Sequence, residues 1–111
     1  MTTVEDPRIS RFHSMLADDP DNELAWFSLG QALFETKRLA EAEAAFGRAV
    51  ELQPDLMMAW YRRGQCLIAL GRPAEARPYA EETLKLAIAQ NHVGPRGDAE
   101  DLLEEIDDAL D

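Results

Sequence analysis

The sequence predicts an all-α protein, a stack of antiparallel helix hairpins with about six helices. Alanine and leucine are abundant, whereas the β-branched residues that favour strands are scarce. Apolar residues recur at spacings of three and four, as on one face of a helix. The phrase "AWFSLGQAL" at 25–33 returns as "AWYRRGQCL" at 59–67, which is 34 residues later. Recurrence at this period indicates stacked helical units.

The first expected helix covers residues 6–19. Asp6 can cap it, Pro7 suits the first helical position, and Pro20 closes it. Its apolar face would comprise Ile9, Phe12, His13 and Leu16.

The next two helices are expected over 22–35, with Asp21 or Asn22 as the cap, and over 38–52, where Pro54 prevents a further turn. Because only a short link separates them, they must pack antiparallel as a hairpin.

A second hairpin follows with the same spacing. Its first helix is expected over 56–70, with Gly71 marking the C-terminal end. Its second helix would start at Pro73 and run to about Asn91, because Ile88 occupies the position of Pro54. Pro78 lies inside this helix and should either kink it or delay its regular start.

After a linker, "HVGPRG", Asp98 can cap a final helix over about 97–110. Its apolar face would comprise Ala99, Leu102, Leu103, Ile106 and Leu110, and its other faces are almost entirely acidic. The acids suit a solvated surface better than a calcium loop, because such loops need a glycine turn that this segment lacks.

Gly30 and Gly64 lie in the middle of the repeated phrase. A glycine inside a helix costs about 1 kcal/mol relative to alanine, so close approach of a partner helix is the expected gain. Ala42 and Ala76 would supply the matching small surface, with a tryptophan four residues before each glycine covering the edge of the hairpin.

These residues resemble the signature of the tetratricopeptide repeat (TPR) family. The first copy matches at Trp26, Leu29, Gly30, Leu33, Ala42, Phe46, Ala49 and Pro54, and the second keeps Trp60, Gly64, Leu67 and Ala76. The second copy departs at Arg63, Ala80, Thr83 and Ile88, where Tyr79 is placed to fill the gap left by Ala80. The resemblance implies a right-handed superhelical stack of the hairpins. It also implies one domain over 1–111, with a half-repeat helix at 6–19, repeats at 23–56 and 57–90, and a capping helix at 97–110.

The resemblance also implies a non-catalytic scaffold that holds a peptide or helix of a protein partner in a concave groove. The groove would be lined by Leu24, Phe27, Gln31, Phe34 and Glu35 from one helix and by Met58, Tyr61, Arg62, Gln65, Ile68 and Ala69 from the next. For the aliphatic positions and Phe34, burial under a neighbouring helix is an equal alternative. For Phe27, Gln31, Tyr61 and Gln65 the groove is favoured.

A subset of the family binds chaperone C-termini through lysine, asparagine and arginine. Here Phe27 and Gln31 stand where its first lysine and asparagine would be, which disfavours that ligand and leaves Arg62 as the only similar cation. Arg62 and Arg63 form an adjacent basic pair that could meet an acidic partner or the acidic C-terminal helix of the same chain, and pairing within the chain is the simpler expectation.

The net charge of −11 is concentrated at the two ends of the chain, and residues 25–91 are neutral. This distribution disfavours nucleic acid and anionic membranes as partners. A lone cysteine, no apolar leader and no membrane-length apolar segment indicate the cytoplasm.

No enzyme, cofactor or metal site is expected. Cys66 replaces Ala32 in the repeated phrase, so it is better explained as a small buried residue than as a nucleophile served by His13 or His92. The second function expected is weak homo-oligomerisation through exposed repeat ends, because two and a half repeats bury little continuous core.

Overall fold

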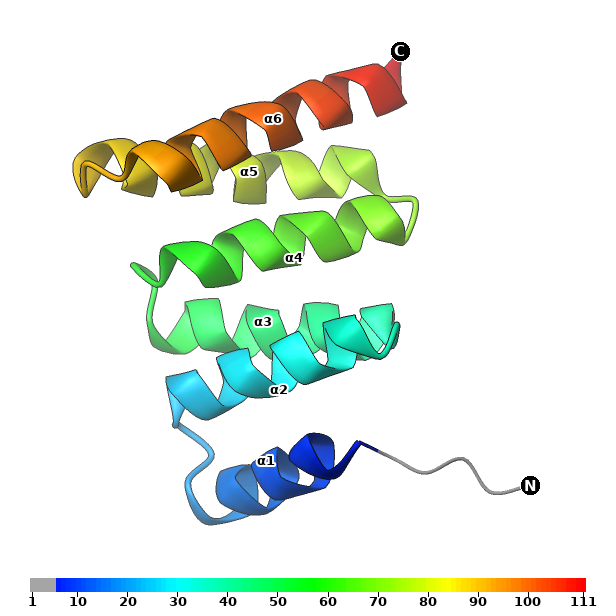
Figure 1. Cartoon of the computed structure of the whole chain (residues 1–111), viewed down its shortest axis with the longest axis vertical. Helices are drawn as coiled ribbons and strands as arrows, with labels where there is room; N and C mark the ends of the chain where they lie inside the picture. Colours follow the sequence, from blue (N-terminus) through cyan, green and yellow to red (C-terminus); the bar gives the residue numbers. More distant parts are fainter. Residues whose placement is uncertain (1–5) are drawn as a thin grey trace.

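The computed structural model describes residues 6–111, which form six α-helices stacked along the longest axis of the molecule (Figure 1). They are α1 (Pro7–Asp18), α2 (Glu23–Glu35), α3 (Leu39–Leu52), α4 (Met57–Ala69), α5 (Pro73–Ala89) and α6 (Val93–Leu110). Principal extents of 41 × 33 × 20 Å describe a short slab. Among the described residues no strand is present, so the predicted all-α solenoid is confirmed.

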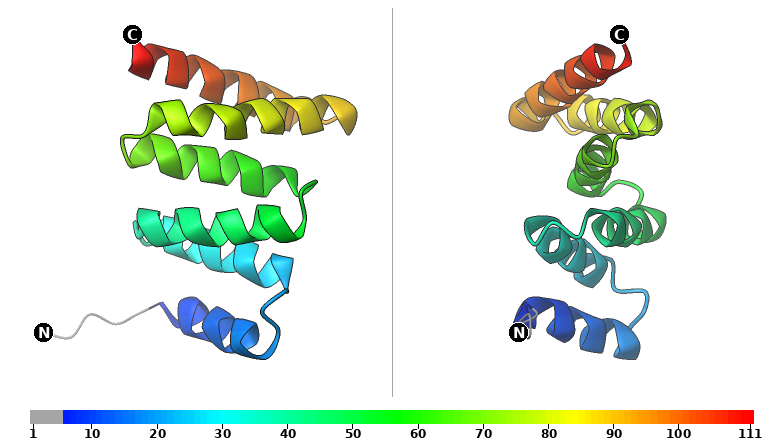
Figure 2. Two further views of the ribbon diagram at one scale, coloured as in Figure 1. Left: turned by 180° about the vertical axis from the view of Figure 1, so that it is seen from behind. Right: turned by 90° about the vertical axis from the view of Figure 1, so that its right-hand side faces the viewer.

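Each helix packs against the next one along the chain, and α4 additionally touches α6. Helices α2 and α6 lie in front in the view of Figure 1, whereas α3 and α5 lie behind them, and the order reverses when the molecule is seen from behind (Figure 2). We call the side of α2, α4 and α6 the front face and the side of α3 and α5 the back face. This arrangement places equivalent residues of the two repeats side by side on one surface.

The N-termini of the first two helices are fixed by the expected caps. The Asp6 carboxylate accepts a hydrogen bond from the Arg8 backbone N–H at 2.9 Å, and the Asn22 side chain accepts one from Ala25 N–H at 3.0 Å. Both satisfy backbone donors that have no partner within the helix.

Three helices end in the same way, with a left-handed residue just past the last turn. Lys37, Gly71 and Asn91 have φ values of 65°, 76° and 58°. The residue after each donates its N–H to the carbonyl five positions back, for example Arg38 to Leu33 and Arg72 to Leu67, both at 2.8 Å. This Schellman arrangement reverses the chain and confirms the hairpins predicted from the short links.

The two tryptophans make equivalent hydrogen bonds. Trp26 Nε1 donates to the Pro20 carbonyl at 2.8 Å, and Trp60 Nε1 donates to the Pro54 carbonyl at 2.7 Å. Each indole therefore ties the start of its hairpin to the loop that precedes it.

Both glycines allow the close approach of a partner helix that the sequence predicts, but through different neighbours. A Cβ added to Gly30 would lie 2.6–2.9 Å from three ring atoms of Phe46 in α3, so this glycine makes room for that ring. At Gly64 the nearest atom would be Leu102 Cδ2 at 3.1 Å, with the Ala76 carbonyl oxygen at 3.8 Å. The second glycine therefore lies near its expected alanine, but its closest neighbour comes from α6.

The last two helices also differ from prediction. Helix α6 begins at Val93, so "GPRG" is helical rather than a linker, and His92 precedes the helix in place of Asp98 as cap. Pro95 is accommodated because N–H groups of the first turn need no partner within the helix. Helix α5 starts regularly at Pro73 with Pro78 inside it, so its start is not delayed, and it ends at Ala89, close to the predicted end near Asn91.

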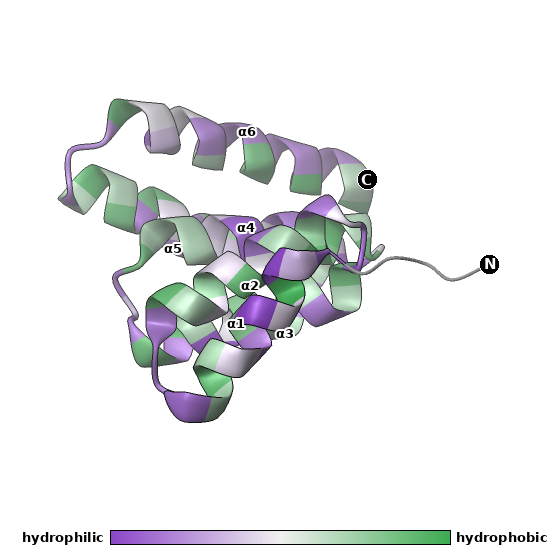
Figure 3. Cartoon of the chain, turned by 60° about the horizontal axis from the view of Figure 1, so that its bottom comes forward, coloured by the Kyte–Doolittle hydropathy of each residue, from purple (hydrophilic) through white to green (hydrophobic). Residues whose placement is uncertain are grey.

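In α1, Ile9 and Leu16 are buried as expected and Phe12 is half-buried, but His13 is exposed. Along α6, hydrophobic residues alternate with hydrophilic ones (Figure 3). Only Ala99, Leu102 and Ile106 of this helix are buried, which leaves most of its surface to acids.

Candidate functional site

The front face carries a cavity of about 200 Å³ where α2, α4 and α6 meet. It is lined by Phe34, Gln65, Ile68, Ala69, Leu102 and Glu105. The first four belong to the predicted groove. Leu102 and Glu105 come from α6 and were missed, because the sequence does not reveal on which side of the second repeat the last helix packs.

A short polar network borders the cavity on α4. Arg62 Nη1 donates to Gln65 Oε1 at 2.8 Å, and Gln65 Nε2 donates to the Tyr61 hydroxyl at 3.2 Å. The Arg62 guanidinium also lies over the rings of Phe34 and Tyr61, 5.9 and 5.8 Å from their centroids. The structure thus brings four predicted residues from two helices into one cluster.

Arg62 keeps unused hydrogen-bonding capacity. Its Nε is buried and has no hydrogen-bond partner, and within residues 6–111 no carboxylate lies within ion-pair distance of its side chain. The expected pairing of Arg62 and Arg63 with the C-terminal helix is therefore wrong. Arg63 instead binds Glu43 of α3 at 2.7 Å, and the partner of the α6 residue Asp107 is Arg77 of α5.

Acidic residues of α6 lie beside this network. The pKa of the Tyr61 hydroxyl is raised, first by burial and then by the negative charge of Asp98, with Glu105 and Asp101 contributing and Arg62 opposing. Among the described residues, none of these three carboxylates forms an ion pair. The front face is therefore apolar at Phe34 and Ile68, cationic at Arg62 and anionic along α6.

The remaining predicted groove residues lie further along the same helices. Leu24 is 59% exposed, and Met58 and Gln31 are half-buried. Phe27 is tied to the core, because its ring packs on that of Phe46 with centroids 5.6 Å apart. Glu35 is exposed and binds Arg8 of α1 at 2.6 Å, which engages it within the chain.

The alternative for the aliphatic groove positions, burial under a neighbouring helix, holds for Ile68 but not for Leu24. Ile68 packs against the cluster that contains Leu102 and Ile106 of α6, so the last helix does cover one side of it. Leu24 has no such cover.

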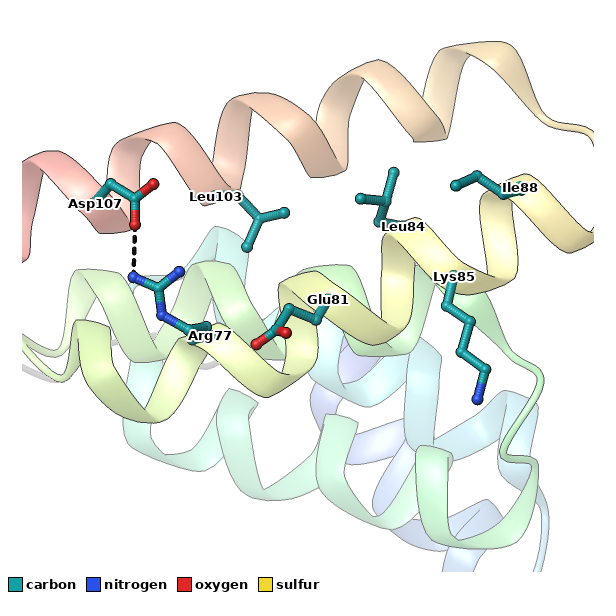
Figure 4. A pocket seen from close by; sticks show the side chains of 7 residues that line it. All are labelled: Arg77, Glu81, Leu84, Lys85, Ile88, Leu103 and Asp107. Atoms are coloured by element: carbon teal, nitrogen blue, oxygen red, sulfur yellow. Dashed lines mark hydrogen bonds and ion pairs between the residues drawn. The ribbon is translucent and has the colours of Figure 1, made fainter.

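A larger cavity of about 600 Å³ lies on the back face between α5 and α6 (Figure 4). Leu84, Ile88 and Leu103 form its apolar lining, and the Arg77–Asp107 ion pair at 2.6 Å closes one end. The sequence signal for it is Ile88, which replaces the helix-stopping proline of the first repeat and is 54% exposed.

Cys66 is fully buried, and burial raises the pKa of its thiol to about 12, with Glu43 adding to the effect. The thiol is therefore protonated at neutral pH and is a poor nucleophile. His13 and His92 are both exposed. Within residues 6–111, no three His, Cys, Asp or Glu side chains are grouped so that they could hold a metal ion.

The tetratricopeptide repeat family model matches residues 9–56 and 39–91. The chain belongs to the tetratricopeptide repeat family. None of the curated proteins matches it in sequence. No helix of the described TPR domain is both long and apolar enough to cross a bilayer.

Solved TPR domains share this architecture. The first TPR domain of Spaghetti (RPAP3), bound to the HSP90 peptide SRMEEVD, superposes with a TM-score of 0.81 at 29% identity, over 92% of this chain and 76% of that one. The TPR2B domain of yeast Sti1, in a pHsp70 complex, gives a TM-score of 0.83 at 18% identity, over 90% and 80% of the two chains. The fold is thus one that other proteins use to bind peptides.

Proposed function

We propose that this TPR domain is a non-catalytic adaptor that binds a peptide or helix of a protein partner on its front face. The observation that carries the proposal is the cavity between Phe34 and Ile68, bordered by Arg62 and Gln65. An apolar pocket beside groups that can hydrogen-bond suits a peptide, whose side chains need burial and whose backbone needs partners.

The groove extends from this cavity along α2 and α4. The Gln31 side chain makes no hydrogen bond within residues 6–111, so its amide is available to a peptide backbone. Leu24 and Met58 add apolar surface at the far end, and the flexible methionine can adapt to different side chains. The peptide-bound RPAP3 domain supports the use of this fold, at 29% identity, for the same purpose.

A photo-crosslinking amino acid at Gln31 or Gln65, introduced one at a time, tests the proposal in the native cell. We expect both positions to capture the same protein, because they lie on neighbouring helices of one face. The matched control is Ala44, which is exposed on α3 of the back face. Capture of that protein from Ala44 but from neither glutamine would place its binding surface elsewhere.

Self-assembly through repeat ends is the weaker candidate. At the C-terminal end of the stack, a helix from another copy would have to pack on α6, which carries exposed Glu104 and Asp108 without an ion pair within residues 6–111. Burying unpaired acids in such a contact is costly. Sedimentation velocity across protein and salt concentration distinguishes the two functions, and a monomer under all conditions would remove self-assembly.

A further inference from the structure

The charges around the front cavity are unevenly placed, and this bears on the chemistry of the partner. The groove face of α2 presents uncharged Phe27, Gln31 and Phe34 together with Glu35, whose charge is paired with Arg8, and α4 presents one cation, Arg62. On α6, Glu105 lines the front cavity, and the negative charges of Asp98, Asp101 and Glu105 all raise the pKa of the Tyr61 hydroxyl, so they lie on the groove side. One cation therefore faces three carboxylates.

We infer that the partner segment is basic, with an apolar side chain in the cavity between Phe34 and Ile68 and a lysine or arginine directed at Asp98, Asp101 and Glu105. The inference rests on the proposed groove function and names the class of its ligand. The apolar cavity provides the binding site, and the unpaired carboxylates at its edge select which segment enters.

The positions of the acidic residues around α6 support a preference for basic segments. At 100° per residue, Asp98, Asp101 and Glu105 fall within one third of the helix circumference, next to the buried Leu102 that lines the cavity. A basic side chain following an apolar one would reach them directly. Two further acids of α6, Glu100 and Asp107, are engaged by Arg96 and Arg77, so they do not compete for it.

The net negative charge of the whole chain also favours a basic partner. A net charge of −11 attracts cationic segments and repels anionic ones, chiefly through the rate of association. Arg62 does not reverse this preference, because it opposes the charges of α6 without forming an ion pair to any of them. An acidic segment such as SRMEEVD, which RPAP3 binds, would place its carboxylates against those of α6.

Two synthetic peptides test the inference by NMR titration of the full chain, read from the side-chain amides of Gln31 and Gln65. One is SRMEEVD. The other, Ac-SRMKKVK-NH2, reverses its acidic positions and has no terminal carboxylate. We expect the basic peptide to shift both amides and to bind about tenfold more tightly than the acidic one at low salt, with the difference decreasing as salt screens the charges.

Variants identify the charges responsible. Asp98→Asn, Asp101→Asn and Glu105→Gln together should weaken the basic peptide at least fivefold. The control combines Glu100→Gln and Glu104→Gln on the outer side of α6 with Asp111→Asn just past its end. It changes net charge equally and should have less than a twofold effect. Arg62→Met should strengthen the basic peptide about twofold, a gain that structural damage would not produce. Thermal melting checks that each variant is folded.

The remaining outcomes separate the inference from the proposed function. If only the acidic peptide shifts the glutamine amides, the groove binds peptides but its basic preference is wrong. Equal weakening by the two triple variants would assign the effect to net charge and overturn the role of the α6 carboxylates. If neither peptide shifts Gln31 or Gln65, the preference for this basic chemistry is rejected, while crosslinking at the same two positions still decides whether a partner occupies the groove.

Discussion

The two hairpins share a sequence phrase but complete their cores differently. In the α2–α3 hairpin, the Phe46 ring fills the space that Gly30 leaves open, so the packing is internal to the repeat. In the α4–α5 hairpin the position equivalent to Phe46 is Ala80, and the space at Gly64 is approached most closely by Leu102 of α6. The second repeat therefore takes a large core side chain from the helix that follows it.

Other departures of the second repeat change its contacts with neighbouring helices. Tyr79 packs against the core of the second repeat, with its Cβ 3.6 Å from a Cβ placed at Gly64, and its ring lies on Trp60 with centroids 5.5 Å apart. Arg63 lies 4.6 Å above that ring while binding Glu43. With Ile88 in place of Pro54, α5 has 17 residues against 14 in α3. The repeat is adapted to accept a final helix, so α6 is a component of the core as well as a cover.

Replacing Leu102 with alanine tests this difference most strongly. Leu102 is 3% exposed and lies in the core of the second repeat, so Leu102→Ala should lower the free energy of unfolding by about 2–5 kcal/mol. Urea denaturation measures the loss. Leu103→Ala, at a half-buried neighbour on the back cavity, is the control and should cost clearly less. Equal losses would mean that α6 only shields the second repeat from solvent.

Much of the fold was predictable because its signals are local. Helix limits follow from caps and stop residues such as Asp6, Asn22 and Gly71, and the register of the repeats follows from the recurring phrase. The start of α6 was not predictable in this way. Its first turn, which contains Gly94 and Pro95, has poor helix propensity, and the Schellman turn at Asn91 together with packing on α5 outweighs that preference.

The candidate site was predictable in part for the same reason. Spacing places Phe34, Gln65 and Ile68 on one face of their helices, and the structure brings them to one cavity. The contribution of Leu102 and Glu105 depends on how α6 crosses α4, which is a tertiary contact with no local sequence signal. The acidic character of the groove edge was therefore invisible until the helices were assembled.

The two glycines offer a smaller and more direct comparison. Alanine at Gly30 must displace the fully buried Phe46 ring, at an overpacking cost of about 1–3 kcal/mol, against a gain of about 1 kcal/mol in helix propensity. Alanine at Gly64 meets the end of a leucine at 3.1 Å, so the propensity gain should roughly cancel its cost. We expect Gly30→Ala to lower the melting temperature and Gly64→Ala to leave it almost unchanged.

A double variant tests whether contact with the Phe46 ring causes the destabilisation expected for Gly30→Ala. Gly30→Ala combined with Phe46→Leu should be less destabilised than the sum of the two single variants, because the smaller side chain makes room for the new methyl group. Strict additivity would mean that the close contact at Gly30 does not limit stability.

The smallest expected effect concerns the turns that end α2 and α4. Gly71 adopts a φ of 76° without steric cost, whereas Lys37 holds a φ of 65° at the equivalent position of the first repeat. A side chain in this region is strained by about 1–2 kcal/mol, partly offset because glycine is more flexible in the unfolded chain. Lys37→Gly should therefore raise the free energy of unfolding by about 0.5–1 kcal/mol, and Gly71→Ala should lower it by a similar amount. Chemical denaturation measures the free energy of unfolding of both variants. The explanation by backbone strain fails if the two substitutions change this free energy in the same direction.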